Sequence, residues 1–326
     1  MLVDCFLVLT FLEVVAPYIG GNPQDCAEVW TSLRPKEIQK KLSSKGLEVS
    51  YYIACCLISH AGLKRRSYVK NKTMVASHPL RNAQFEKIAD LKSTFIEQAC
   101  PVLSIDTKKK ELIGNFARQG HYYDTDPRVV NDHDFESFAQ GKIVPHGIYD
   151  IAKNKGYITL GSSKDTSAFV CDNIEQFWEQ ELKHQYANKD TILIVCDGGG
   201  SNNARHYIVK EDLYKLAKKI KMNIRIAHYP PYCSKYNPIE HRLFAHLHHA
   251  WEGCTLNSIE IAKELAKNTK TKKGLEVKVN INQKEYETKR KVQKQFKQNL
   301  NKIIEFDEQI PQWNYIIKYQ NDDVIF

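Results

Sequence analysis

The chain has 326 residues, of which 42% are hydrophobic and 26% are charged, the composition of an ordinary soluble globular protein with a sizeable core. No apolar run is long enough to span a membrane. Nine cysteines without a CxxC pair exclude a regular disulfide framework and indicate free thiols in a reducing cytoplasm. The net charge of +9 is concentrated in two stretches, because residues 34–72 hold 10 basic and 2 acidic side chains and residues 263–302 hold 13 and 4. Such stretches indicate a polyanionic partner, nucleic acid first, although lysines also serve to solvate helix faces.

The first fifteen residues are apolar and raise the question of a signal peptide. They carry Asp4 in place of a basic start and Glu13 within the run, and no small-residue cleavage site follows closely. We therefore expect a buried helix here.

Residues 31–68 predict two short helices joined by a tight turn. Thr31 or Ser32 can cap the first helix, Pro35 suits its first turn, and Gly46 ends it. This helix-glycine-helix order is the outline of a helix-turn-helix, whose second helix enters the major groove of DNA. Many helical hairpins that do not bind DNA share the pattern.

The second helix of this unit is expected to begin after Ser50 and to end at Gly62. Its buried stripe would consist of Ile53, Ala54, Leu57 and Ile58. The side chains that lie off the stripe or just beyond it are the candidates for DNA contact: Tyr51, Tyr52, Lys64, Arg65 and Arg66.

Residues 71–85 show weak periodicity and predict a linker, so that residues 1–85 form an N-terminal helical region and residues 86–326 a second domain with a basic C-terminal arm. In the second domain, strands are expected at residues 101–106, 111–116, 146–151, 157–160, 191–196 and 223–228, and helices at 166–186, 211–221 and from Pro238 onward. Antiparallel strands followed by helix-strand alternation indicate an α/β fold. The order is compatible with a ribonuclease-H-like mixed sheet with flanking helices, preceded by a small all-α region.

Three acidic residues stand at positions that suit catalysis. Asp106 ends the first of these strands, and Asp197 ends the most apolar strand and precedes Gly198–Gly200. Glu240 lies in the first turn of the last helix. Each also has a structural explanation: Asp106 suits a turn, Asp197 suits the start of a glycine loop, and Glu240 suits a capping box.

The three positions favour a catalytic interpretation more strongly when they are considered together. Glu240 shares a helix face with Phe244, Leu247 and Trp251, and a carboxylate on an apolar face is costly unless a positive charge pairs with it. Two aspartates at strand ends can converge on the same point. Oxygen-only ligands suit Mg²⁺ or Mn²⁺, and two such ions can activate a nucleophile and stabilise the leaving oxygen of a phosphodiester.

The segments around these acids resemble bacterial insertion-sequence DDE transposases (ISAzo type) of the group close to the mariner supergroup. The resemblance covers most of the chain from about residue 30 and is carried by SIDTKKKELIGNF (104–116), VVNDHDF (129–135), SKDTSAF (163–169), IVCDGGGSNNARH (194–206), HYPPYCSKYNPIEHRLF (228–244) and WNYII (313–317). Members of this group extend further upstream, so this chain is expected to lack part of an N-terminal DNA-binding region.

The resemblance implies that Asp106, Asp197 and Glu240 are the catalytic acids and bind two Mg²⁺ ions, for which Mn²⁺ can substitute. It also implies a bacterial, nucleoid-associated enzyme that binds its element's ends as a homodimer on double-stranded DNA, nicks them, and joins the freed 3′-hydroxyl to target DNA.

Several other side chains are assigned from their positions in the sequence. Lys108 and Lys109, with Lys110, either hold DNA or solvate a hairpin, and His133 and Asp134 are candidates to support the carboxylates by hydrogen bonds. His241 either lies near the scissile phosphate or on the helix surface.

Other kinds of site and other functions compete with this interpretation. A zinc site among the histidines and cysteines at 233–254 lacks the usual ligand spacing, and the 198–203 loop lacks the ending of a nucleotide-triphosphatase loop. The rival functions are an inactive transposase-derived DNA-binding protein and a ribonuclease-H-like nuclease.

Overall fold

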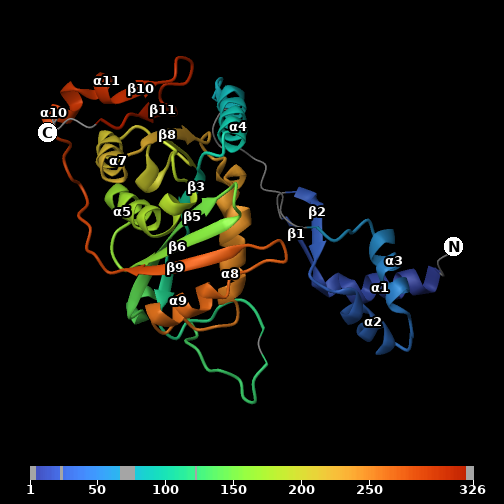
Figure 1. Cartoon of the computed structure of the whole chain (residues 1–326). Coiled ribbons are helices and arrows are strands. Elements are labelled where there is room, and N and C mark those ends of the chain that lie inside the picture. The colour runs from blue at the N-terminus through green and yellow to red at the C-terminus, as the bar shows by residue number, and fades with distance from the viewer. Residues whose placement is uncertain (1–4, 23–24, 67–77, 122, 321–326) are drawn as a thin grey trace. The chain divides into compact units, whose positions relative to one another are not determined.

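The computed structural model describes residues 5–22, 25–66, 78–121 and 123–320. The chain divides into two compact units, Met1–Ala76 and Ser77–Phe326, which are described separately below (Figure 1). The expected boundary near residue 85 is thus replaced by one between residues 76 and 77. The second unit begins with the helix α4 (Arg81–Glu97), which includes the last five residues of the linker expected at 71–85. Residues 71–77 of that linker lie outside the described part of the chain.

The N-terminal unit is a group of three helices accompanied by a β-hairpin. Its elements are α1 (Cys5–Val15), the 3₁₀ turn η1 (Ala16–Tyr18), β1 (Ile19–Asn22), β2 (Asp25–Thr31), α2 (Pro35–Ser43) and α3 (Tyr51–His60). Phe11 and Val15 from α1 pack against Ile38, Leu42 and Leu57 in one buried cluster. The expected N-terminal helix is therefore present, but it is buried on one side only. The antiparallel hairpin β1–β2 was not predicted from the sequence.

The pair α2 and α3 follows the helix-turn-helix outline closely. Gly46 and Gly62, with φ of +81° and +74°, occupy the left-handed region in the turns that follow the two helices, which favours glycine. The Ser50 hydroxyl accepts a hydrogen bond from the Ile53 N–H at 3.3 Å, as predicted for a cap. The predicted cap of α2 is wrong, because the residue before Pro35 is Arg34, whose N–H donates to the Glu37 carboxylate at 2.6 Å.

The second unit is built on a nine-stranded mixed sheet. Its strands are β3 (Val102–Thr107), β4 (Glu111–Ile113), β5 (Gly141–Asp150), β6 (Lys155–Gly161), β7 (Thr191–Cys196), β8 (Asn223–His228), β9 (Glu276–Asn282), β10 (Ile304–Phe306) and β11 (Asn314–Ile317). The order across the sheet is β10-β11-β8-β7-β3-β5-β6-β9, with β4 paired to β5. The antiparallel meander β3-β5-β6, joined through β3 to the parallel strands β7 and β8, gives the ribonuclease-H-like mixed α/β fold that the sequence predicts.

Helices cover both faces of this sheet (Figure 1). On one face lie α5 (Ser167–Phe177), continued by the π-helical η3 (Trp178–Leu182) and α6 (Lys183–Gln185), and α7 (Tyr207–Ile220). On the other face α4 covers β3, β7 and β8. The π-helical η6 (Glu240–Phe244), α8 (Ala245–Trp251) and α9 (Ile259–Lys267) pack over β5, β6 and β9. Short helical turns complete the chain: η2 (Glu136–Phe138), η4 (Gly200–Asn202), η5 (Ser234–Tyr236), α10 (Lys294–Gln298) and α11 (Leu300–Ile303).

The C-terminal basic stretch differs most from its prediction. It is not an arm, because β9 pairs in parallel with β6 over seven residues and forms one edge of the sheet. The last two strands, β10 and β11, extend the opposite edge beside β8. Several of its basic side chains are neutralised by acids of the same unit: Lys278 pairs with Glu181, Lys284 with Asp172 and Arg290 with Asp212.

Two sequence-wide expectations can be compared with the described residues. Their helices include none that combines the length and apolarity needed to cross a bilayer. The eight cysteines whose side chains are described are free thiols.

Candidate active site

Asp106 and Asp197 lie at the same edge of the sheet. Asp106 is the next-to-last residue of β3, and Asp197 directly follows β7. The two strands are parallel neighbours, with Ser104 opposite Val195, so their carboxyl ends lie side by side. After β7 the backbone turns through Gly200, whose φ of +55° favours glycine, and the Gly199 N–H donates to the Asp197 carboxylate at 3.3 Å.

The segment that carries Glu240 is attached to β3 by buried hydrogen bonds. The Asn237 amide donates to the Ile105 carbonyl at 3.1 Å, and the Ser104 hydroxyl donates to the Asn237 side-chain oxygen at 2.5 Å. The same hydroxyl accepts from the Ile239 N–H at 3.0 Å. A capping box at Glu240 would require the side chain of Asn237, three residues earlier, to cap the helix, and that side chain instead bonds to β3. It fixes the start of η6 to the strand that carries Asp106.

Close packing against β5 holds this segment from the other side. Gly147 lies opposite Asp106 in the β3–β5 ladder. A Cβ at Gly147 would lie 2.5 Å from Phe244 Cε1 and 2.8 Å from Ile239 Cδ1, so only glycine lets η6 approach the strand this closely. Phe244, Leu247 and Trp251 are buried as predicted, and Glu240 is half-buried at the start of their helix.

The electrostatics show that the three acids act on one another. The pKa of Asp106 is raised to about 8, chiefly by burial and then by the charge of Asp197. The charges of Glu240 and Asp165 also raise it, and a hydrogen bond from the Thr107 N–H lowers it. Burial also raises the pKa of Asp197 and that of Glu240, and the charge of Asp197 adds to the rise at Glu240. In the absence of a cation, the carboxylates therefore destabilise one another in their charged forms.

The donor set consists of carboxylates alone, and oxygen ligands suit hard divalent cations. Within the described ranges, no three His, Cys, Asp or Glu side chains are gathered closely enough to enclose one ion. The charges of Asp197 and Glu240 nevertheless both act on Asp106, so a cation bound beside Asp106 would relieve the repulsion among the three carboxylates. This suits Mg²⁺, which commonly takes one or two carboxylates and completes its shell with water and phosphate oxygens.

Three of the residues around this edge were missed by sequence reasoning. The ring of His228, which is buried, lies with Nδ1 3.0 Å from the Asp197 carbonyl oxygen and Nε2 3.4 Å from the Tyr315 hydroxyl. Asn237 falls within the segment 228–244 that carries the family resemblance, so the sequence marked its position but not its bonds to β3. Asp165 falls within the SKDTSAF segment, but nothing in its spacing indicated a place beside Asp106.

Two predicted supporting residues do not take that role. His133 and Asp134 are exposed in the loop between β4 and β5, and His133 contacts Asp132 at 3.1 Å and stacks on Phe135. The loop turns their side chains to solvent, away from the buried strand ends. His241 is also exposed and contacts the Lys235 carbonyl, but its charge acts on Glu240 and lowers the pKa of that carboxyl.

The lysines after Asp106 divide into two kinds. Lys108 is half-buried, pairs with Glu111 at 2.5 Å and lies over the Trp251 ring, so its charge is engaged within the protein. Lys109 and Lys110 are exposed.

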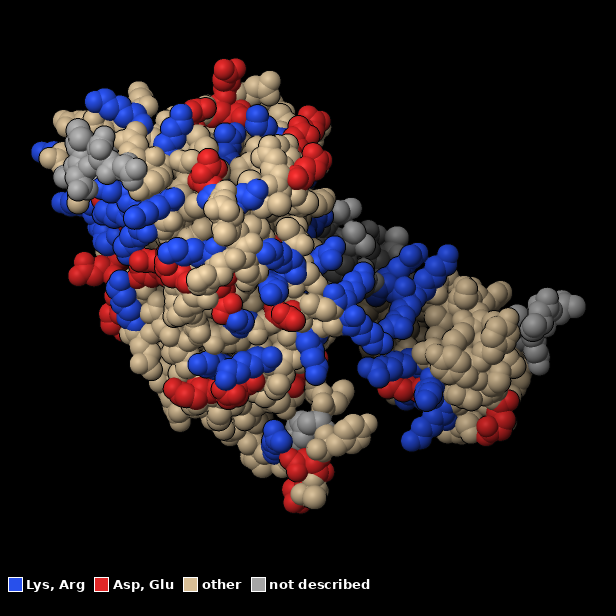
Figure 2. Space-filling view, viewed as in Figure 1, with Lys and Arg blue, Asp and Glu red and all other residues tan. Residues whose placement is uncertain are grey.

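The candidate DNA-contact residues of the N-terminal unit are all exposed. Tyr51 and Tyr52 begin α3 and are 53% and 65% exposed. Lys64, Arg65 and Arg66 follow α3 and are exposed. Figure 2 shows Lys and Arg side chains gathered on one side of this unit.

Comparison with known proteins gives a family for nearly the whole chain. Residues 10–319 match the family described as Rhodopirellula transposase DDE domain. Solved structures with a similar fold include the mariner Mos1 paired-end complex with Mg, at 15% identity and a TM-score of 0.44 over 78% of this chain and 68% of that one. The catalytic domain of Mos1 mariner transposase matches at 16% identity and a TM-score of 0.37, over 58% and 82%. A comparison with curated proteins finds no match.

Proposed function

Because the chain belongs to the Rhodopirellula transposase DDE domain family, and is thus a transposase of the DDE type, we propose that Asp106, Asp197 and Glu240 are its catalytic acids. In this proposal the protein binds the ends of its mobile element, nicks them in a reaction that requires Mg²⁺, and transfers the freed 3′-hydroxyl to target DNA. Mn²⁺ can replace Mg²⁺. The protein would act as a homodimer on double-stranded DNA in the nucleoid.

The observation that carries the proposal is the central place of Asp106 among the carboxylates. Its pKa of about 8 reflects burial together with the charges of Asp197 and Glu240. A raised pKa means that the charged form of this carboxyl is unfavourable without a cation nearby. A bound cation would stabilise that form, so the electrostatics of the site favour metal binding. No Lys or Arg within the described ranges forms an ion pair with any of these three side chains, which leaves a cation to neutralise them.

The chain's residues would divide the work as follows. Bound Mg²⁺ supplies Lewis acidity to the phosphodiester and lowers the pKa of the attacking hydroxyl. Asp106, Asp197 and Glu240 would hold the ions, and Asp106 is the acid on which the charges of both others act. Asn237 and Ser104 would hold Glu240 at a fixed distance from Asp106, since they tie its helix to β3.

DNA binding would be divided between the units. Lys64, Arg65 and Arg66 would grip phosphates, and Tyr51 and Tyr52 would reach base edges from the start of α3. Lys109 would contact DNA near the reacting phosphate, whereas Lys108, which is paired with Glu111, would chiefly support Glu240.

The test is Mg²⁺-dependent nicking of a labelled transposon end by the parent, Asp197→Asn and Glu240→Gln. Both variants keep the size of the side chain and remove its charge, so we expect end binding to persist and nicking to fall by several orders of magnitude. A matched control is Glu264→Gln on α9, which removes an exposed carboxylate paired with Lys267 and is expected to leave nicking unchanged. Equal nicking by parent and both site variants would remove the catalytic assignment and leave a DNA-binding protein.

A further inference from the structure

A fourth carboxylate lies beside the two aspartates. Asp165 stands in the loop between β6 and α5, and its Oδ1 accepts a hydrogen bond from the Thr107 hydroxyl at 3.2 Å. Thr107 directly follows Asp106 on β3. The other oxygen, Oδ2, lies 4.0 Å from the point where a Cβ of Gly200 would be, so it faces the glycine turn that follows Asp197.

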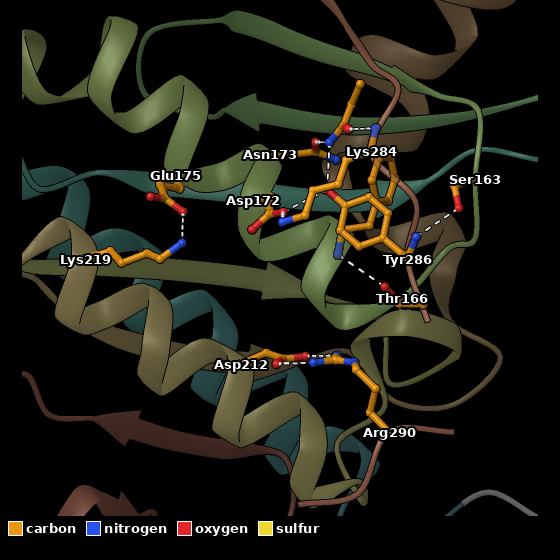
Figure 3. Close-up of polar contacts among 12 residues, drawn as sticks. Ser163, Thr166, Asp172, Asn173, Glu175, Asp212, Lys219, Lys284, Tyr286 and Arg290 are labelled. Carbon is orange, nitrogen blue, oxygen red and sulfur yellow. Dashed lines mark hydrogen bonds and ion pairs between the residues drawn. The ribbon is translucent and has the colours of Figure 1, made fainter. Parts of the chain in front are cut away.

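The loop that carries Asp165 is held in place from both ends. At its start, the Ser163 hydroxyl donates to Glu285 at 2.7 Å. The same hydroxyl accepts from the Tyr286 N–H at 3.1 Å (Figure 3). At its end, the Thr166 hydroxyl accepts from the Phe169 N–H at 3.3 Å and caps α5. Asp165 is therefore fixed at the edge of the sheet.

The segment that holds Ser163 is itself anchored on α5 and α7. Lys284 pairs with Asp172 at 2.6 Å, and Arg290 pairs with Asp212, which is buried, through both carboxylate oxygens at 2.9 and 2.5 Å (Figure 3). A two-pronged bond between guanidinium and carboxylate has a defined geometry as well as strength. The residues that follow β9 thus serve as a strap for the Asp165 loop.

The charge of Asp165 acts on one side of the site only. It contributes to the electrostatic environment of Asp106 and of Asp197, but it is not among the charges that act on Glu240. Among the described residues, no Lys or Arg forms an ion pair with Asp165. The negative charge of Asp165 is thus added to those of Asp106 and Asp197 without a basic partner, an arrangement that is costly unless a cation binds there.

We propose that Asp165 is a fourth acidic residue of the site and increases its affinity for a divalent cation on the Asp106–Asp197 side. One oxygen is already engaged by Thr107, so the free oxygen acts through a water of the cation's shell. Asp165 is thereby a positioning residue. The inference rests on the proposed function, since it assumes that Asp106 and Asp197 bind the ion.

The test measures Mn²⁺ binding to the full-length protein without DNA, from the electron paramagnetic resonance signal of free Mn²⁺. Asp165→Asn keeps the bond from Thr107 and removes the charge, and we expect its Mn²⁺ affinity to fall by about 10-fold to 100-fold. Asp165→Glu keeps the charge and is expected to retain more of the affinity than Asp165→Asn. Thr107→Val loses the bond that orients Asp165, and a smaller loss is expected.

Glu264→Gln serves as the matched loss of one carboxylate. If Asp165→Asn binds Mn²⁺ as this control does, while Asp197→Asn has lost binding, the role of Asp165 is wrong and the proposed function stands. If Asp197→Asn also binds Mn²⁺ like the parent, the proposed function itself fails. A thermal unfolding curve of each variant checks that the protein is folded under the conditions in which its Mn²⁺ affinity is measured.

Discussion

The place of Glu240 depends on a glycine in the neighbouring strand, and Gly147→Ala tests this dependence. Gly147 lies in β5 opposite Asp106, beneath the helix that carries Glu240. The added methyl group would lie 2.5 Å from Phe244 Cε1, where ordinary contact begins at 3.4 Å, and 2.8 Å from Ile239 Cδ1. Both neighbours are buried, so neither can turn away into solvent.

The magnitude follows from the overlap. The helix or the strand must move by about 1 Å to restore contact distance, and overpacking of this kind costs about 1–3 kcal/mol of stability. For a domain of this size that is a fall of roughly 2–12 °C in Tm. Because Ile239 and Phe244 flank Glu240 in sequence, the shift passes directly to its carboxylate, and a displacement of about 1 Å can lower the catalytic rate by about 100-fold.

The matched control is Gly141→Ala in the same strand. A Cβ there has only Ile113 Cδ1 within 4 Å, at 3.6 Å, and the φ of Gly141 is not in the left-handed region. Thermal unfolding and Mg²⁺-dependent nicking would be measured on both variants. If Gly147→Ala unfolds and nicks as Gly141→Ala does, the packing of η6 on β5 does not set the position of Glu240.

Two further predictions concern DNA binding and pH. Neutralising the three basic residues at 64–66 should weaken binding to all DNA and reduce its salt dependence, whereas Tyr52→Ala should change preference among sequences; fluorescence anisotropy at several salt concentrations, with specific and random duplexes, distinguishes the two effects. The pKa of Asp106 is raised from 3.8 to about 8, so its contribution to the stability of the cation-free protein is full below about pH 4 and is lost as the pH rises through 8. Mg²⁺ binding requires the charged form, so calorimetric titration should show affinity that increases from pH 6 to pH 8, and a flat profile would contradict the assignment of Asp106 as a ligand.

The sequence was sufficient to predict the parts of the fold in which local pattern and burial agree. The run TILIVC predicted β7 at Thr191–Cys196, and β8 likewise occurs at Asn223–His228 as predicted. Both strands lie near the middle of the sheet, and the continuous apolar run of β7 suits a strand that is covered on both faces. Glycines at 46 and 62 end helical segments as expected because their positive φ angles disfavour other residues.

Edge strands and distant partners could not be predicted in this way. The strand β9 contains Glu276 and Lys278 with exposed side chains, so its local pattern resembles a basic, solvated segment. Its place in the sheet comes from pairing with β6, more than a hundred residues earlier. The hairpin β1–β2 likewise depends on pairing between two separate segments of the chain.

The candidate site shows the same division between local and distant information. Asp106, Asp197 and Glu240 each end or begin an element, and a charged residue at such a boundary is visible in the sequence. Asp165 and Asn237 act across the fold instead: one receives a bond from Thr107 and the other joins β3 through Ser104. The sequence therefore identifies the acids, because each is a charged residue at the boundary of an otherwise apolar element. It does not identify the residues that hold them, because a hydrogen bond between distant segments leaves no regular separation in the sequence.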